Sequence, residues 1–275
     1  MKQMLLCARY ELVLAVRSRW LQAFGVVFAL LVLLVAGSGY ILSGGYGLQD
    51  FSRTAESLVQ LVVLLVPLTA LTFGGLSLIP DPGAAELLYA QPVSRGRILI
   101  GRFLGLLLAL SAAQAIGFGA AGVVLAHETG TIGAGAFLVI VALSFVLGAV
   151  FLSVAALLAQ TRTGGRGAVL AAALAVWFVA VILYDLAALG AASVLHSGAA
   201  SRLLMTAALV NPVDSARTAA LMAIEGTTAF GAASLALLRF TGGEASTYAL
   251  SVSSMLVWAC VPLLLAVRRL HRADL

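Results

Sequence analysis

Side chains that could carry out chemistry are few and widely separated in this chain. The only lysine is Lys2. That count excludes a Walker A phosphate loop, because such a loop needs a lysine directly after a glycine-rich turn. The glycine cluster Thr161–Gly167 contains no lysine, so we interpret it as a flexible turn. A Schiff-base lysine is excluded by the same count, and the sequence predicts no ATP site in this chain.

Asp185, preceded by Tyr184, is the main candidate for enzymatic chemistry inside a membrane. An intramembrane aspartyl protease needs a second aspartate that shares a proton with the first. The motif that begins at Gly117, where this partner would be sought, ends in alanine. His127-Glu128 is followed by Thr-Gly-Thr, which lacks the second histidine of a helical zinc site. We therefore interpret Asp185 as a simple carboxylate about two turns from the outer end of its helix, and we expect no enzymatic activity.

Metal ligands are equally scattered. Copper sites use Met, Cys or His side chains that are paired on one helix face, and the apolar segments contain no such pair. The isolated candidates are His127, His196, His271, Met205, Met222 and Met255. Met1, Met4 and Cys7 do have helical spacing, but an initiator methionine and a membrane-facing stripe explain them. We predict no metal site, and no disulfide between Cys7 and Cys260, because neither is expected to reach an oxidising compartment.

The composition explains this scarcity of reactive groups. The chain has 275 residues, of which 62% are hydrophobic and 10% charged, whereas a soluble domain carries about 25% charged residues. Apolar runs of 20 or more residues favour membrane helices over a barrel. We predict an all-α polytopic membrane protein with a single domain over residues 1–275. Its six expected spans are Trp20–Leu42, Ser57–Ile79, Ile98–Ala126, Ile132–Gln160, Ala168–Ala192 and Ser246–Val267.

Charge placement predicts the orientation of these spans. Basic residues gather in the flank 1–19, in the loop 80–102, after the fourth span and at the C-terminus. The positive-inside rule places these segments in the cytoplasm, which gives an N-in, C-in protein of the bacterial inner membrane. With both termini inside, the number of crossings must be even, and six satisfies this condition.

Residues 203–224 are apolar at both ends but carry Asn211, Pro212, Asp214 and Arg217 in the middle. A single charge at the bilayer centre costs about 3 kcal/mol on insertion scales, and a seventh span would break the even parity. We therefore expect residues 193–245 to form a periplasmic loop, part of which dips into the membrane and returns.

The first 19 residues are too polar for an ordinary signal peptide. Lys2, Arg9 and Arg17 fall on one side of a helix. We predict that residues 1–19 form an interfacial helix in contact with membrane lipid. A solvated basic tail is the simpler alternative.

Span three carries a packing signal. Small residues recur every four positions on one helix face, which lets another helix approach closely. The predicted seam consists of Gly101, Gly105, Ala109, Ala113, Gly117 and Ala121. The sequence leaves open whether this seam packs within the subunit or between two copies.

The polar segment 80–97 joins spans two and three. Asp81 can cap a helix that has Pro82 at its first position, and Pro92 would end that helix. Glu86 is polar, and an apolar docking surface would come from Leu87, Leu88 and Tyr89. A short cytoplasmic helix tied to a span at each end transmits movement well, although a plain connecting loop is also compatible with the sequence.

This segment resembles a motif of ABC-2 type transporter permeases, G-T-L-E-x-L-L-x-x-P-V-S-R-x-x-I-L-x-G-K. Ala84 and Ala85 replace Thr-Leu, and Arg102 replaces the lysine. Residues 211–217 are similar to the N-P-V-D-x-x-R element of the same family, and Glu11 with Arg17-Ser18-Arg19 resembles its N-terminal helix. The matching motif positions are Gly83, Glu86, Leu88, Pro92, Val93, Ser94, Arg95, Leu99 and Gly101.

The resemblance implies a homodimer that docks on two cytoplasmic P-loop ATPase subunits, which bind ATP and Mg. Asp81–Arg95 would form the docking segment, with Glu86 and Arg95 contacting the ATPase. Asn211, Asp214 and Arg217 would meet a periplasmic partner or an exit gate. No nucleic-acid partner is expected.

Within the family, the chain is most similar to permeases of the nitrous-oxide reductase maturation transporter, which serves copper-site assembly with a periplasmic β-helical protein. Two further readings stay open at this point. One is an exporter of another solute, such as a sulfur species, a lipid or a drug. The other is a membrane anchor that transports nothing.

Overall fold

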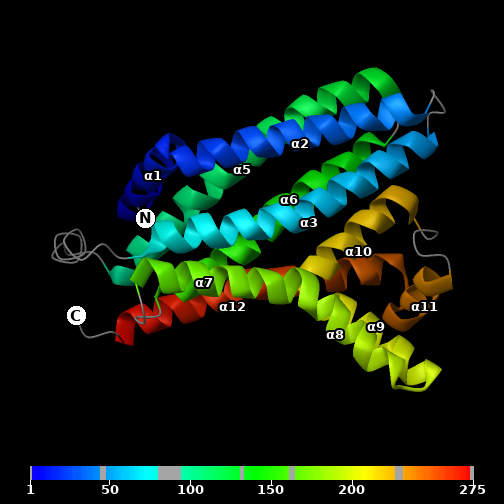
Figure 1. The fold of residues 1–275 in the computed structure, drawn as a ribbon. Coiled ribbons are helices and arrows are strands. Elements are labelled where there is room, and N and C mark those ends of the chain that lie inside the picture. The colour runs from blue at the N-terminus through cyan, green and yellow to red at the C-terminus, as the bar shows by residue number, and fades with distance from the viewer. Residues whose placement is uncertain are drawn as a thin grey trace.

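A computed structural model describes residues 2–43, 48–79, 94–130, 133–160, 165–226 and 232–272. Within these ranges all regular structure is helical. The helices are α1 (Lys2–Arg17), α2 (Arg19–Ser43), α3 (Leu48–Leu78), α5 (Arg95–Thr129), α6 (Ala134–Ala159), α7 (Gly165–Phe178), the π-helix η1 (Val179–Leu183), α8 (Tyr184–Ser193), α9 (Ser197–Val210), α10 (Pro212–Glu225), α11 (Ala232–Thr241) and α12 (Glu244–Arg272) (Figure 1).

Six helical segments are long and apolar enough to cross a bilayer. Their number and order confirm the predicted all-α, six-span architecture. The fifth span is one continuous segment in which α7, η1 and α8 follow without a break. The six apolar segments are Arg19–Gly37, Phe51–Leu78, Arg95–His127, Ala134–Ala159, Gly165–Ser193 and Glu244–His271.

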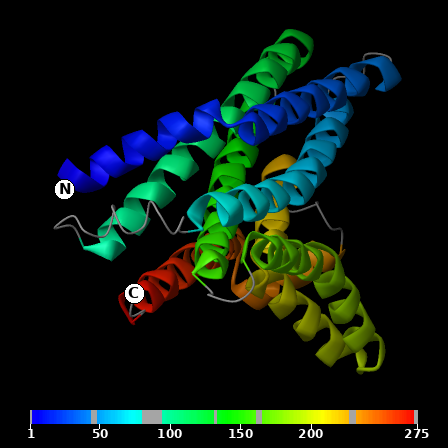
Figure 2. The same ribbon diagram turned by 60° about the vertical axis from the view of Figure 1, so that its left-hand side comes forward.

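The spans pack around α3 and α6. Helix α3 contacts α2, α6 and α7, and α12 packs against α6. Helices α8 and α9 form a pair that projects from the bundle in both views (Figures 1 and 2). The described N- and C-terminal helix ends lie at the same end of the bundle (Figure 1), as an even number of crossings requires. Which side of the membrane this end faces stays a prediction.

Residues 203–224 fold as two helices that break at Asn211. The side chain of Asn211 caps α10 by accepting a hydrogen bond from the Val213 backbone N–H at 3.1 Å. Pro212 stands at the first position of α10, where its missing N–H leaves no helical bond unmade. Neither α9 nor α10 is among the segments long enough to span a bilayer. Re-entry of this region into the membrane stays a prediction.

The N-terminal residues form a helix that ends at Arg17, and α1 packs along α5. Two glycines of the predicted seam make this close approach possible. A Cβ atom on Gly101 would lie 2.8 Å from Cys7 Cβ and from the Met4 carbonyl oxygen. A Cβ atom on Gly105 would overlap the Ala8 carbonyl oxygen. The interfacial position of α1 is not tested by this packing.

Further along α5, the same small-residue face meets α2. A Cβ atom on Gly117 would lie 2.8 Å from Cδ1 of Phe28, a fully buried residue of α2. Phe28 in turn makes an edge-to-face contact with Phe118, with ring centroids 5.3 Å apart. The structure thus places the seam against α1 and α2 of the same chain, where it does not need a second copy.

The glycine contact between α1 and α5 leads to a first prediction. We expect Gly105→Ala to destabilise the protein by about 1–3 kcal/mol, because an added methyl group overpacks a tight site. Cys7 lies on this interface, so thiol-reagent labelling of Cys7 in a Cys260→Ser background should become faster. Gly119→Ala is the matched control, since a Cβ atom at Gly119 meets nothing within 4 Å. Equal labelling of Cys7 in both variants would contradict the predicted contact.

Candidate functional site

Most of the predicted ATPase-docking residues lie outside the described residues. This applies to Asp81, Glu86, Leu87, Leu88 and Tyr89. Arg95 is described and begins α5. The first turn of α5 packs against the end of α12, because a Cβ atom on the neighbouring Gly96 would lie 2.9 Å from His271 Nε2.

Arg102 joins three helices close to this end of the bundle. From α5, its Nε donates to a carboxylate oxygen of Glu11 in α1 at 3.1 Å. Its Nη2 donates to the backbone carbonyl of Ser77, in the last turn of α3. Glu11 is buried and Arg102 is partly buried, so this ion pair is largely shielded from solvent. Residues 80–93 connect α3 to α5. The hydrogen bond from Arg102 to Ser77 joins the same two helices directly, just before and just after this connection.

A second polar cluster lies on α10 and faces the fifth span. Arg217 Nη1 donates to Asp214 Oδ1 at 2.8 Å and to Asp185 Oδ2 at 3.0 Å. Asn211 Nδ2 donates to Asp214 Oδ2 and to the Ala180 carbonyl oxygen, both at 2.9 Å. The structure therefore brings together the predicted residues Asn211, Asp214 and Arg217, and it adds Asp185. We call these four residues the α10 cluster.

The α10 cluster has one cation for two carboxylates. Burial raises the pKa of the Asp214 carboxyl to about 7, the neighbouring Asp185 carboxylate acts in the same direction, and Arg217 and Asn211 oppose both. Nε of Arg217 is also buried and has no hydrogen-bond partner among the described residues. The cluster is thus held by a single guanidinium, and loss of that group would leave Asp214 as a buried, unpaired carboxylate.

The π-helix η1 supplies part of this arrangement. The Ala180 carbonyl lies within η1 and accepts the hydrogen bond from Asn211. Tyr184, at the start of α8, donates through its hydroxyl to the Ala207 carbonyl oxygen of α9 at 3.1 Å. A single-turn π-helix is a common feature of functional sites. In this protein it lies where the fifth span contacts the break between α9 and α10.

Two of these pairings could not be predicted from the sequence. Asp185 was interpreted as a simple carboxylate, whereas the structure pairs it with Arg217. Glu11 and Arg102 were noted as parts of motifs, and their mutual contact was not predicted. The available signal was the presence of opposite charges in otherwise apolar segments, where each charge needs a partner. No group of three His, Cys, Asp or Glu side chains suited to a metal ion was found in the described parts of the chain.

Comparison with known proteins gives a consistent result. A family described as "ABC-2 family transporter protein" matches residues 5–275. A protein of Pseudomonas aeruginosa named "Probable ABC transporter permease protein NosY" is 34% identical over 235 residues, covering 83% of this chain and 85% of that protein. A protein of the same name from Stutzerimonas stutzeri is 34% identical over 269 residues, covering 95% of this chain and 93% of that protein.

The α10 cluster leads to a second prediction. We expect Arg217→Gln to lower the free energy of unfolding by about 1–3 kcal/mol, because the buried Asp214 carboxylate loses its cation in a cluster that is only partly buried. The measurement is denaturant unfolding in detergent micelles. The loss should be greatest at alkaline pH, where Asp214 cannot escape by taking up a proton. Arg202→Gln is the control, because Arg202 is exposed and donates only to the Gly198 carbonyl in its own helix. A loss in Arg217→Gln no larger than in the control would contradict the prediction.

Proposed function

We propose a function for this chain on the basis of its family: the chain belongs to the ABC-2 family of transporter proteins. It is accordingly the permease subunit of an ABC transporter and a multi-pass protein of the bacterial inner membrane. A permease of this kind implies a separate ATPase partner. Beyond this, we propose that the chain couples ATP hydrolysis in the cytoplasm to work at the outer face of the membrane.

The observation that carries this proposal is the double contact of Arg102. A force applied to the segment 80–93 enters the membrane through α3 and α5. Because Arg102 holds both the Ser77 carbonyl and Glu11, α3, α5 and α1 resist separate displacement at this end. Such a junction makes it easier for the three helices to move together as a rigid body than for one of these helices to bend alone.

Helix α3 offers a route from this junction to the α10 cluster. It is 31 residues long, which corresponds to about 46 Å of helix at ~1.5 Å per residue. Ser77 lies near its C-terminal end, and α10 packs against α3, α6 and α12 (Figure 1). A shift of α3 would therefore displace α10, which carries Asn211, Asp214 and Arg217. In the proposed mechanism, α10 passes the movement to a periplasmic partner, and its buried Asn211 and Asp214 and its partly buried Arg217 link it to the fifth span.

The apolar interior supports force transmission more than solute export. Gln114 and Ser144 are fully buried and bond to each other, with the Ser144 hydroxyl donating to Gln114 Oε1. Tight packing surrounds them, since a Cβ atom on Gly148 would lie 3.3 Å from Gln114 Nε2. A path for a charged solute would need a lining of polar groups, and this pair is closed off from solvent.

The proposed client is the copper-site assembly of nitrous-oxide reductase. It is supported by the resemblance of the whole chain to permeases of that maturation system and by the name NosY that both relatives carry. In this proposal two copies of the chain work with two ATPase subunits and a periplasmic β-helical protein. The alternatives are export of another solute by the same dimer and a non-transporting anchor. Failure to co-purify with a P-loop ATPase would favour the anchor.

The proposed docking role of residues 80–97 leads to a third prediction. We expect Glu86→Arg to abolish stimulation of the ATPase subunit while leaving the amount of inserted permease unchanged, because a reversed charge repels its docking partner. The measurement is the ATP hydrolysis rate of the co-expressed, purified transporter. Glu244→Arg is the control, since Glu244 is an exposed acidic residue in the first turn of α12. Normal stimulation in Glu86→Arg would remove residue 86 from the proposed interface.

A further inference from the structure

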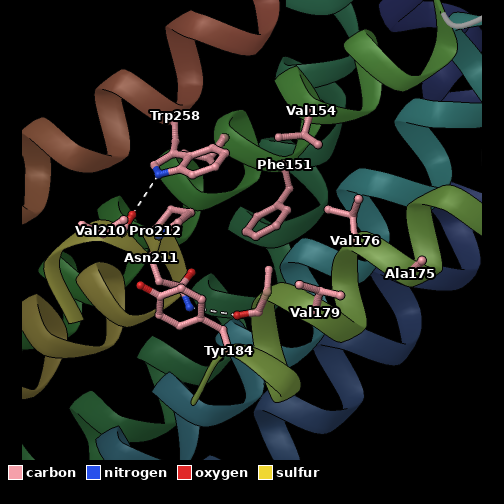
Figure 3. A pocket seen from close by; sticks show the side chains of 12 residues that line it. Phe151, Val154, Ala175, Val176, Val179, Tyr184, Val210, Asn211, Pro212 and Trp258 are labelled. Carbon is pink, nitrogen blue, oxygen red and sulfur yellow. Dashed lines mark hydrogen bonds between the residues drawn. The ribbon is translucent and has the colours of Figure 1, made fainter. Parts of the chain in front are cut away.

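An apolar cavity of about 380 Å³ lies beside the π-helix. It is enclosed by α6, by the fifth span, by α12 and by the junction of α9 and α10 (Figure 3). Its volume falls at the lower end of the ~300–1,000 Å³ typical of small-molecule sites. Its lining includes Phe151 and Val154 of α6, Ala175 and Val176 of α7, Trp258 of α12 and Asn211.

The polar groups along this cavity already have partners in the protein. Trp258 Nε1 donates to the Val210 carbonyl oxygen at 2.9 Å (Figure 3). The Tyr184 hydroxyl donates to the Ala207 carbonyl, and the Asn211 amide donates to the Ala180 carbonyl and to Asp214. A buried water needs two to four polar partners. The N–H and O–H donors of Trp258, Tyr184 and Asn211 already bond to protein oxygens and are not free to bind such a water. The occupant that matches this wall is uncharged and forms no hydrogen bonds.

The position of the cavity identifies the class of occupant. Ala175 and Trp258 lie in the middle parts of two candidate spans, Gly165–Ser193 and Glu244–His271. Ala175 is itself exposed, so the cavity is accessible from the surface of the spans. The surroundings of the middle of a span are lipid hydrocarbon. We propose that this cavity binds one acyl chain of a membrane phospholipid.

A bound acyl chain would fill the space between the π-helix and the α9–α10 junction. Two hydrogen bonds cross this region, from Asn211 to Ala180 and from Trp258 to Val210. Dispersion contacts are lost wherever a wall faces empty space, so a filled cavity holds these elements in place better than an empty one. This proposal does not depend on the client of the transporter or on the docking of the ATPase.

The test uses the full-length protein in nanodiscs whose phospholipid carries a photoreactive diazirine in the middle of one acyl chain. After irradiation, peptide mass spectrometry locates the lipid adducts. We expect adducts on the walls of the cavity, including Phe151 and Val176, and a loss of these adducts in Ala175→Phe, whose ring occupies the space. Adducts on the exposed Leu256 and Leu264 of α12 should persist and report ordinary contact with lipid.

Leu174→Phe is the matched control, because Leu174 is an exposed neighbour that does not line the cavity. It should leave the wall adducts unchanged. Val154→Phe fills the cavity from α6 and should reproduce their loss if the Ala175→Phe ring turns outward. The proposal is overturned if wild-type protein shows no adduct on Phe151 or Val176, or if both filling variants keep these adducts. It is equally overturned if a photoreactive residue at position 176 captures a second copy of the chain.

Discussion

A charge that is removed from water needs a partner of opposite charge, and the described helices form such ion pairs in two places. One is Arg102 with Glu11, beside the C-terminal end of α3, and the other is the α10 cluster, on a helix that packs against α3. Each place combines charged side chains with backbone carbonyls, as buried charges require. The fold can therefore be described as apolar spans with one electrostatic tie beside the C-terminal end of α3 and a second on α10, which packs against α3.

This distribution gives the two ties different mechanical characters. At Arg102 one guanidinium holds three helices through a carboxylate and a carbonyl, and glycines let α1 lie directly on α5. In the α10 cluster one guanidinium serves two carboxylates, next to a π-helix and an apolar cavity. The first is suited to receive a force without deforming. The second, which has two carboxylates for one guanidinium and lies beside a cavity, is suited to change its arrangement.

Much of the fold was predictable because the hydrophobic pattern alone determines it. Six apolar runs led to six spans. The break between α9 and α10 at Asn211 was not predicted, although Asn211 as a cap and Pro212 at the first helical position are typical of a helix start. The glycine–alanine repeat predicted a seam on α5 but not its partners, since a small residue specifies close approach and not which helix approaches. The pairs Glu11–Arg102 and Asp185–Arg217 join residues 91 and 32 positions apart. Such pairings depend on the tertiary arrangement, which no local pattern encodes. The apolar run of the fifth span likewise carries no residue pattern that marks the π-helix.

The central claim is that Arg102 passes movement from the ATPase side to α10. The most direct measurement is the ATP-dependent change in thiol labelling of Ala223→Cys, a half-buried position on α10, in an assembled transporter with Cys7→Ser and Cys260→Ser. Our account predicts that ATP alters the labelling rate, and that Arg102→Met removes this response while the ATPase subunit stays bound. An unchanged ATP response in Arg102→Met would contradict the account.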